Sequence, residues 1–191
     1  MTVETLKLDD GSLYEGEVAG GKPNGKGKLT KKYDGIYEGN FVDGKINGKG
    51  KFIGSYGNIY EGDFVDGYKE GKGKLTDWSG DVYEGDFDFN RRHGKGKVTH
   101  KNGEVYEGDF YSDQISGKGR LIYKNGDVYE GDFARNERNG KGALTRANGK
   151  IIDGYWFGDK FMGEGEDGKA IMDEKQAKLD AAYELQNRIC P

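Results

Sequence analysis

A tyrosine recurs every 23 residues along most of this chain, and this periodicity constrains the fold more than any other feature. Ile152 takes the seventh place in a series whose first six members are Tyr14, Tyr37, Tyr60, Tyr83, Tyr106 and Tyr129. Counting each of these as position 0, glycine stands at positions 2, 11 and 13 of all seven repeats. Such a period indicates a stack of small, similar structural units instead of a globule built around one core.

Each repeat reads as a β-hairpin. Residues 82–87 and 94–99 both alternate in residue type with period two, which is typical of strands. Position 7 carries Gly, Asn or Asp, the residues that tolerate positive φ, so a left-handed turn residue is expected there. Further glycines mark a second turn between repeats, at Gly57, Gly80, Gly103, Gly126 and Gly149. The expected fold class is therefore all-β, an antiparallel sheet of tandem hairpins.

The side chains divide into two faces if the strands pair symmetrically about a six-residue connection. That register sets Phe87 opposite Gly94, Gly85 opposite Gly96 and Tyr83 opposite Val98. It predicts a core face on which rows of large rings lie over a floor of glycine. On the other face it pairs acids with bases inside each hairpin: Asp63 with Lys72, Glu61 with Lys74, Asp86 with Lys95, Glu84 with Lys97, Asp109 with Lys118, and Glu107 with Arg120.

The ends of the chain differ from its middle. Leu6 lies 23 residues before Leu29, which predicts one extra N-terminal strand. From about Lys169 to Ile189 there is no Gly or Pro, and Met172, Leu179, Ala182 and Tyr183 lie near one face of a helix. The expected domains are a repeat array over residues 1–168 and, over residues 169–191, a helix that either caps the last hairpin or docks a partner.

Composition excludes several classes of function. The 30 basic and 34 acidic side chains nearly balance, which argues against nucleic-acid binding. The only cysteine, Cys190, allows no disulfide within the chain, so a reducing compartment is expected. No signal peptide, myristoylation site or membrane span of roughly 20 residues is present, which predicts a cytoplasmic protein. No nucleophile–base pair stands out, so we expect neither an enzyme nor a cofactor.

Two clusters are candidate binding sites. Arg91, Arg92 and His93, with Lys31 and Lys32 as a weaker second group, are the local excesses of positive charge. They indicate either solvated turns or contacts with an anionic lipid or an acidic partner. Tyr155, Trp156 and Phe157 interrupt the charged alternation and are either covered by the C-terminal helix or exposed to a partner. His93 and His100, the only histidines, lack further ligands for a metal site.

Residues 60–64, Tyr-Glu-Gly-Asp-Phe, followed by residues 71–75, Gly-Lys-Gly-Lys-Leu, carry a pattern that resembles the MORN family (membrane occupation and recognition nexus). In-phase copies cover residues from about 10 to 168. The resemblance implies an elongated, twisted, single-layer antiparallel sheet, which agrees with the alternation. Family members include junctophilins, plant phosphatidylinositol-phosphate kinases, a lysine methyltransferase, radial-spoke heads of cilia and cytoskeletal proteins of parasites, so the fold does not choose the function.

Two functions remain open at this stage. A chain made of repeats alone resembles the ciliary and cytoskeletal members, which predicts a non-catalytic scaffold in a cytoskeletal or ciliary assembly, axonemal and radial-spoke-like, with protein partners and a possible homodimer. The alternative is a peripheral module that binds phosphoinositides or another anionic membrane surface. The basic residues Arg91, Arg92 and His93 motivate the alternative.

Overall fold

The structure, a computed structural model, describes residues 2–189. Cys190, on which the expectation of a reducing compartment rests, lies outside these residues. The fold is an open antiparallel sheet in which strand order follows chain order, with one C-terminal helix. The all-β class, the tandem hairpins and the extra N-terminal strand are thus confirmed. The chain contacts group into two compact segments, residues 1–102 and 103–191, which are described in turn.

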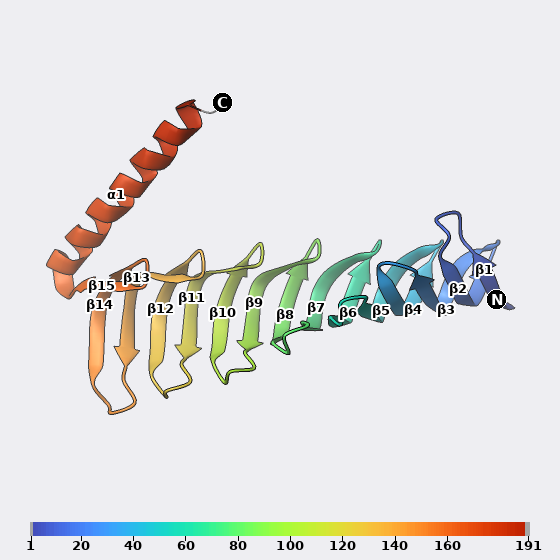
Figure 1. Ribbon diagram of the computed structural model, residues 1–191, viewed down its shortest axis with the longest axis horizontal. Coiled ribbons are helices and arrows are strands. Elements are labelled where there is room, and N and C mark those ends of the chain that lie inside the picture. Colours follow the sequence, from blue (N-terminus) through green and yellow to red (C-terminus); the bar gives the residue numbers. More distant parts are fainter. Residues whose placement is uncertain (1, 190–191) are drawn as a thin grey trace. The chain divides into compact units, whose positions relative to one another are not determined.

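The N-terminal segment contains nine strands in a single layer (Figure 1). Each strand pairs antiparallel with its predecessor in the chain, from the extra strand β1 onward. The strands are β1 (Thr2–Lys7), β2 (Leu13–Ala19), β3 (Lys22–Lys31), β4 (Gly35–Val42), β5 (Lys45–Gly54), β6 (Ile59–Val65), β7 (Tyr68–Thr76), β8 (Val82–Asp88) and β9 (Arg91–Thr99).

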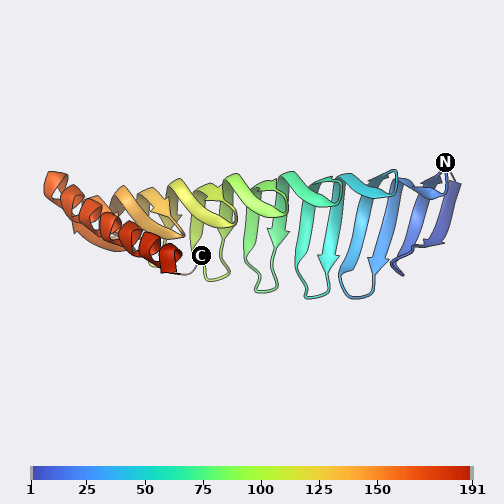
Figure 2. The same cartoon turned by 90° about the horizontal axis from the view of Figure 1, so that it is seen from above.

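The C-terminal segment continues the same pattern (Figure 2) and ends in a helix that contacts β14 and β15. Its elements are β10 (Val105–Tyr111), β11 (Gln114–Ile122), β12 (Val128–Ala134), β13 (Glu137–Thr145), β14 (Ile151–Phe157), β15 (Lys160–Gly163) and α1 (Gly165–Ile189). The helix begins four residues before the predicted start at Lys169. Gly168 fits inside it because this residue packs against Gly163, where a Cβ would lie 2.2 Å from the Gly163 carbonyl oxygen.

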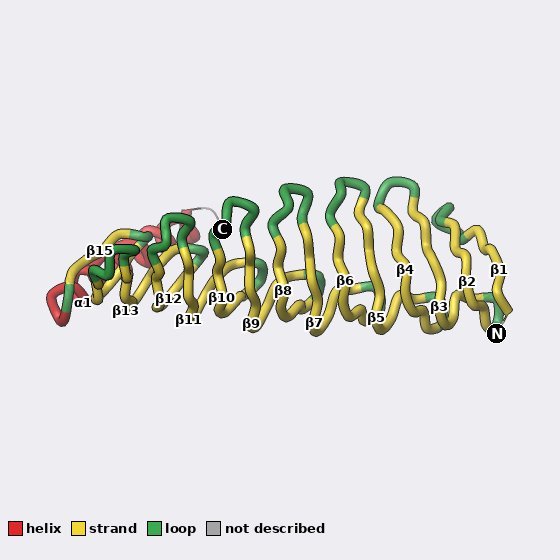
Figure 3. The backbone as a smooth tube through the Cα atoms, turned by 90° about the horizontal axis from the view of Figure 1, so that it is seen from below, coloured by secondary structure: helices red, strands yellow, loops and turns green. Residues whose placement is uncertain are grey.

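The hairpin turns are tighter than the sequence predicted. Only positions 6 and 7 lie between the strands, and both have positive φ, as in Phe89 (44°) and Asn90 (70°). This is the two-residue type I′ turn, whose twist matches that of paired strands. The left-handed residue expected at position 7 is confirmed, whereas the six-residue connection was wrong. Figure 3 shows the turns of the N-terminal segment alternating between its two edges.

A β-bulge in the hairpin makes its register differ from the predicted one. Tyr83 faces Val98 and Gly85 faces Gly96 as predicted, but the pairing shifts beyond Gly85. Phe87 faces Arg92 in its own hairpin and Gly71 in the preceding one, instead of Gly94. Gly94 belongs to the bulge and has a φ of 61°. A Cβ on Gly94 would point to the Asp86 side chain, 3.0 Å from a carboxylate oxygen, and therefore away from the aromatic face. The glycine at position 11 is needed for its backbone conformation and is not part of the glycine floor.

The aromatic rows form the core even though the sheet has one layer. Tyr60, 0% exposed, packs edge-to-face against Phe64 of its own hairpin and Phe87 of the next, with ring centroids 5.0 and 4.9 Å apart. Its hydroxyl donates to the Asp63 carbonyl oxygen at 2.9 Å. The equivalent hydroxyl bond recurs at Tyr14, Tyr37, Tyr83, Tyr106 and Tyr129. Rings at such distances and angles gain energy beyond the area they bury.

The glycine floor beneath these rings is confirmed. A Cβ on Gly96 would lie 2.4 Å from the Tyr83 ring, and a Cβ on Gly85 would lie 2.4 Å from the Tyr83 hydroxyl. Position 2 and position 13 therefore stay glycine because the tyrosine ring rests on bare backbone.

On the opposite face, the predicted register is confirmed for Glu61 with Lys74, Glu84 with Lys97 and Glu107 with Arg120. It was wrong for the aspartates at position 3, which do not face position 12 of their own hairpin. Ion pairs also join neighbouring hairpins. Lys72 contacts Asp86 at 2.6 Å and Lys74 contacts Glu84 at 2.9 Å, in both cases from β7 to β8. Lys49–Asp63, Lys51–Glu61, Lys118–Asp132 and Arg120–Glu130 follow the same rule. The bulge is the reason, since its two extra residues bring the Lys95 amide, at 3.0 Å, to the carboxylate of Asp86.

The buried tyrosines make stability sensitive to alkaline pH. Burial raises the pKa of Tyr37 to about 12, against an ordinary value of 10.0, and the hydrogen bond to Asn40 offsets only part of this rise. Burial likewise raises the pKa of Tyr60, Tyr106 and Tyr129. Because the folded-state pKa lies above the unfolded one, this contribution to stability is complete below about pH 10 and is lost as pH rises toward about 12.

We therefore expect the sheet to unfold between about pH 10 and 12, with tyrosinate absorbance and the loss of far-ultraviolet circular dichroism following one curve. The titration requires both signals on the same sample. Complete tyrosine ionisation near pH 10 with an unchanged dichroism spectrum would contradict the burial of these hydroxyls.

Candidate interaction surfaces

The predicted basic cluster at the start of β9 does not form one patch. Its three residues alternate between faces, as strand geometry requires. Arg92 lies on the aromatic face, where its guanidinium is 5.7 Å from the centre of the Tyr83 ring. Arg91, which is exposed, and His93, which is half-buried, lie on the opposite face, across from Asp88 and Asp86. An anionic ligand on one face would thus meet only part of the cluster.

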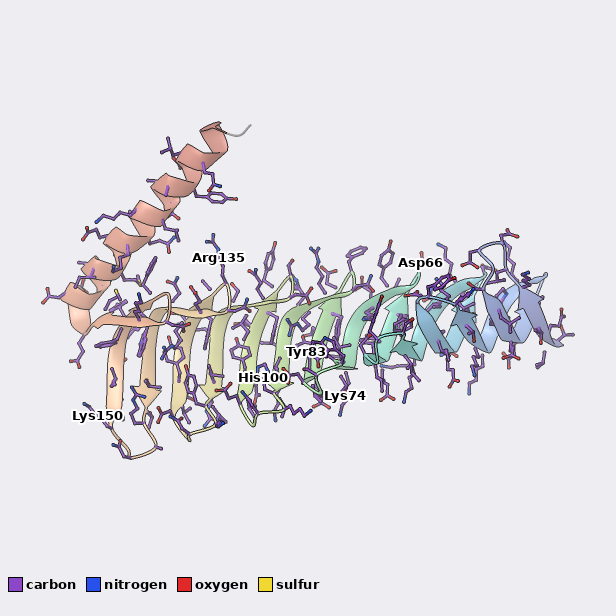
Figure 4. All side chains as sticks on the ribbon, viewed as in Figure 1. Asp66, Lys74, Tyr83, His100, Arg135 and Lys150 are labelled. Atoms are coloured by element: carbon purple, nitrogen blue, oxygen red, sulfur yellow. The ribbon has the colours of Figure 1, made fainter. Side chains whose placement is uncertain are left out.

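The second basic group lies at the other edge of the N-terminal segment. Arg91 follows a hairpin turn, whereas Lys31 ends β3 at a turn between repeats. Figure 4 marks these edges, with Asp66 at a hairpin turn and His100 beside a turn between repeats. Lys31 lies 3.9 Å from Asp34, and the Lys32 ammonium lies 5.1 Å from the centre of the Tyr33 ring. The structure therefore does not bring the two basic groups together.

Trp156 is a core residue, so little of its surface is left for contact with a partner. It occupies position 4 of its repeat, where phenylalanine stands in most others, and is 3% exposed. Its indole N–H donates to the Gly142 carbonyl oxygen at 2.9 Å, and the Arg138 guanidinium stacks 4.3 Å from its ring centre. Tyr155 and Phe157 are half-buried, so these two neighbours keep part of their surface open.

A groove of about 330 Å³ opens on the aromatic face of the N-terminal segment. Its floor is apolar and its rim is charged, with Lys31, Asp34 and Lys69 among the lining residues. The floor is formed by Leu29, Tyr37, Ile46, Phe52 and Phe64. An apolar floor with polar groups at the rim suits a polypeptide segment that buries side chains and keeps its backbone partly solvated.

A second groove, of about 360 Å³, lies on the same face of the C-terminal segment. Arg138 and Trp156 line it, with Arg146 and Phe161. The charges in it are neutralised, because Arg138 contacts Asp159 at 2.9 Å and Arg146 contacts Asp127 at 2.7 Å. The hydrogen bonds from Ala147 and Arg146 lower the pKa of Asp127 against the effect of burial, so this carboxylate stays ionised. The groove therefore offers aromatic surface without an excess of charge.

Sequence reasoning missed three exposed aromatic residues at the turns between repeats. Tyr33, Tyr56 and Trp78 are 81%, 86% and 78% exposed and stand on three successive turns along one edge of the N-terminal segment. The available signal was an aromatic residue inside each of three turns that otherwise contain Lys, Asp, Ser, Asn and Gly.

The helix α1 leaves most of its predicted apolar face uncovered. Met172 is half-buried, whereas Leu179 and Tyr183 are 43% and 62% exposed. A cap on the last hairpin, one of the two roles expected for this helix, would therefore involve Met172 and not Leu179 or Tyr183. Over residues 2–189, no helix is both long enough and apolar enough to span a membrane.

Comparisons with known proteins identify the repeats. The family model described as MORN repeat matches residues 14–32, 37–58, 60–82, 83–105, 106–128 and 129–151. The seventh repeat, which begins at Ile152, is not matched, although β14 and β15 continue the hairpin pattern there. No curated protein sequence matches the chain.

Solved structures show only a remote likeness. The TCP domain of SAS-4 from Drosophila melanogaster, in complex with a proline-rich motif of Ana2, has 13% sequence identity and a TM-score of 0.41, covering 81% of this chain and 90% of that one. The TCP10 domain of CPAP from Danio rerio, in complex with a peptide of STIL, has 14% identity and a TM-score of 0.29, covering 80% and 93%. These scores are too low to support an argument about function.

The family assignment thus rests on sequence, where six matched segments cover more than half of the chain. Repeats of this kind are typical of scaffolds that interact with proteins or membranes. The hairpins, their glycine floor and their 23-residue spacing agree with the match, and the chain belongs to the MORN-repeat family.

Proposed function

We propose that this protein is a non-catalytic scaffold that binds a protein partner within a cytoskeletal or ciliary assembly. The apolar groove of the N-terminal segment carries this proposal. Its floor residues Ile46 and Phe52 remain partly open to solvent on the face where the other large rings are buried. Apolar surface that a fold could cover but leaves open is typical of an interaction site.

The charged face supports a structural role. Acids that stand two apart on one strand, such as Glu84 and Asp86, each contact a lysine of the preceding hairpin. The Lys72 ammonium and the Lys95 amide lower the pKa of Asp86 although burial raises it, so this carboxylate is not poised to act as an acid near neutral pH. The same arrangement recurs at Asp132, with Lys118 and Lys141, as expected for structure and not for a single active site.

The test is cosedimentation with demembranated axonemes and with purified microtubules. We expect the protein to pellet with one of these and the Ile46→Glu variant to remain in the supernatant. A bound partner would have to bury the new carboxylate in the apolar groove, which costs free energy. Val65→Glu is the matched control, since Val65 is 53% exposed on the opposite face. Circular dichroism confirms that both variants fold. Failure of the parent protein to pellet with either preparation would exclude the cytoskeletal assignment.

The alternative is a peripheral module that binds anionic membranes through its basic residues. The exposed position of Arg91 favours it. Because Arg92 contacts the Tyr83 ring, charge reversal there would also disturb the core, so Arg91→Glu is the cleaner variant. The control is Arg135→Glu, because Arg135 is exposed in the hairpin turn between β12 and β13. Binding to phosphoinositide-containing vesicles that weakens with salt and with Arg91→Glu, but not with Arg135→Glu, would favour this alternative. Absence of binding at physiological salt would exclude it.

A further inference from the structure

The three exposed aromatic residues Tyr33, Tyr56 and Trp78, here called the aromatic ladder, serve no visible purpose in the fold. More than three quarters of each side chain faces solvent. Burial of apolar area therefore cannot explain their presence. Single exposed apolar residues are ordinary, but here one stands on each of three successive turns along the same edge, at position 19 for Tyr33 and Tyr56 and at position 18 for Trp78.

The turns themselves do not require aromatic side chains. At position 18, where Trp78 stands, the later turns carry Lys101, Lys124 and Ala147, and at position 19, where Tyr33 and Tyr56 stand, they carry Asn102, Asn125 and Asn148. In the second and third turns the glycine conformation does not depend on an aromatic residue, since φ is 86° at Gly57 and 95° at Gly80, against 94° at Gly103. The ladder is thus confined to the first part of the chain for a reason other than turn geometry.

Hydrogen bonds fix the backbone from which the ladder projects. The Ser55 hydroxyl donates to the Tyr33 carbonyl oxygen at 2.9 Å, and the Ser55 amide donates to the Asp34 carbonyl oxygen at 3.0 Å, which ties the first turn to the second. In the third turn, one carboxylate oxygen of Asp77 accepts hydrogen bonds from the Ser79, Gly80 and Asp81 amides. A surface held in this way loses little conformational freedom when it binds a ligand.

The spacing of the ladder selects a ligand. Successive turns of one edge are two strands apart, which corresponds to about 9.6 Å. A polyproline II helix advances about 3.1 Å per residue and repeats every three residues, which gives about 9.3 Å. We propose that the aromatic ladder binds a proline-rich segment in the polyproline II conformation, with every third residue of the segment resting on one ring. The inference deepens the proposed function and rests on it, because it names the class of partner.

The chemistry of the ladder agrees with this ligand. Proline rings pack against flat aromatic surfaces, and the carbonyl groups of a polyproline II helix, which form no internal hydrogen bonds, can accept from the tyrosine hydroxyls and the Trp78 indole N–H. Lys32, whose ammonium lies beside the Tyr33 ring, is placed to meet an acidic residue that flanks the proline-rich segment.

Two dye-labelled peptides of equal length test the spacing by fluorescence anisotropy with the full chain. One repeats Pro-Pro-Ser four times and places a proline at every third position. The other repeats Pro-Pro-Ser-Ser three times, so that no three prolines lie in register on one side of the helix. We expect the first to bind about tenfold more tightly. Tyr33→Ser, Tyr56→Ser and Trp78→Ser should each weaken its binding about three- to tenfold, and the triple variant should abolish it.

Asn102→Ser, in a turn that lacks an aromatic residue, is the matched control and should leave binding unchanged. Equal affinity for the two peptides, no binding of the Pro-Pro-Ser peptide at millimolar concentration, or undiminished binding by the triple variant would each overturn the proposal. Binding to vesicles of phosphatidylserine and phosphatidylcholine that only the ladder variants lose, without peptide binding, would assign the ladder to a membrane and also overturn it. Sedimentation with axonemes is scored separately, so the scaffold proposal can survive this failure.

Discussion

Replacing Gly96 with valine is expected to lower the free energy of unfolding by about 1 to 3 kcal/mol, although valine favours strands more than glycine does. The Cβ would lie 2.4 Å from a carbon of the Tyr83 ring and 2.5 Å from its hydroxyl oxygen. That ring is 3% exposed, and its hydroxyl is bonded to the Asp86 carbonyl oxygen at 2.7 Å, so it cannot move without losing other contacts. Urea denaturation followed by circular dichroism measures the change.

A double-mutant cycle separates this clash from other effects of the substitution. In a Tyr83→Leu background the ring is absent, so Gly96→Val should cost less than in the parent protein. Equal costs in the two backgrounds would show that the ring does not rest on Gly96. A variant more stable than the parent would reverse the assignment of the two faces.

Replacing Trp156 with alanine is expected to cost about 3 to 5 kcal/mol, because it removes a large side chain from the core. The change also leaves the Gly142 carbonyl oxygen without the indole hydrogen bond and Arg138 without the ring on which it stacks. Trp156→Phe should cost less, since phenylalanine occupies this position in most repeats. Thermal and urea unfolding of the three proteins provide the comparison.

Trp78→Ala is the matched control, because Trp78 is 78% exposed. Its effect on stability should stay within about 0.5 kcal/mol, as is usual for surface substitutions. If the two tryptophans proved equally dispensable for stability, Trp156 would not be part of the core. The two tryptophans thus differ in role: Trp156 is part of the core, whereas Trp78 is exposed and available for binding.

The periodic part of the fold could be predicted because each repeat is a short hairpin and the same residue pattern recurs in every repeat. The alternation of residue types separated the faces correctly, and glycine at positions 2 and 13 indicated the floor beneath Tyr83. The register of the outer half of the hairpin could not be predicted in the same way. Position 11 is also glycine, and residue type alone does not distinguish a floor position from a bulge residue such as Gly94, whose φ is 61°.

The candidate sites were harder to predict than the fold. The run Arg91-Arg92-His93 looks like one patch in the sequence, but adjacent strand residues point to opposite faces, and Arg92 packs on Tyr83. The aromatic residues of β14 were predicted as a candidate site because they interrupt the charged alternation. Trp156, however, occupies the place of a core phenylalanine. Tyr33, Tyr56 and Trp78 were not predicted because they lie in turns, outside the alternation that defines the strands, and their exposure is evident only in the structure.

The acidic residue at position 3 also explains how a chain of this kind can change its length. In Asp86, one carboxylate oxygen accepts the Lys95 amide of the same hairpin and the other contacts Lys72 of the preceding hairpin. Asp132 does the same with Lys141 and Lys118. If a gene lost or duplicated one whole repeat of this kind, the new junction would again join an aspartate to a lysine at the same positions. Such proteins can therefore vary by 23-residue steps in evolution without compensating substitutions at the junction.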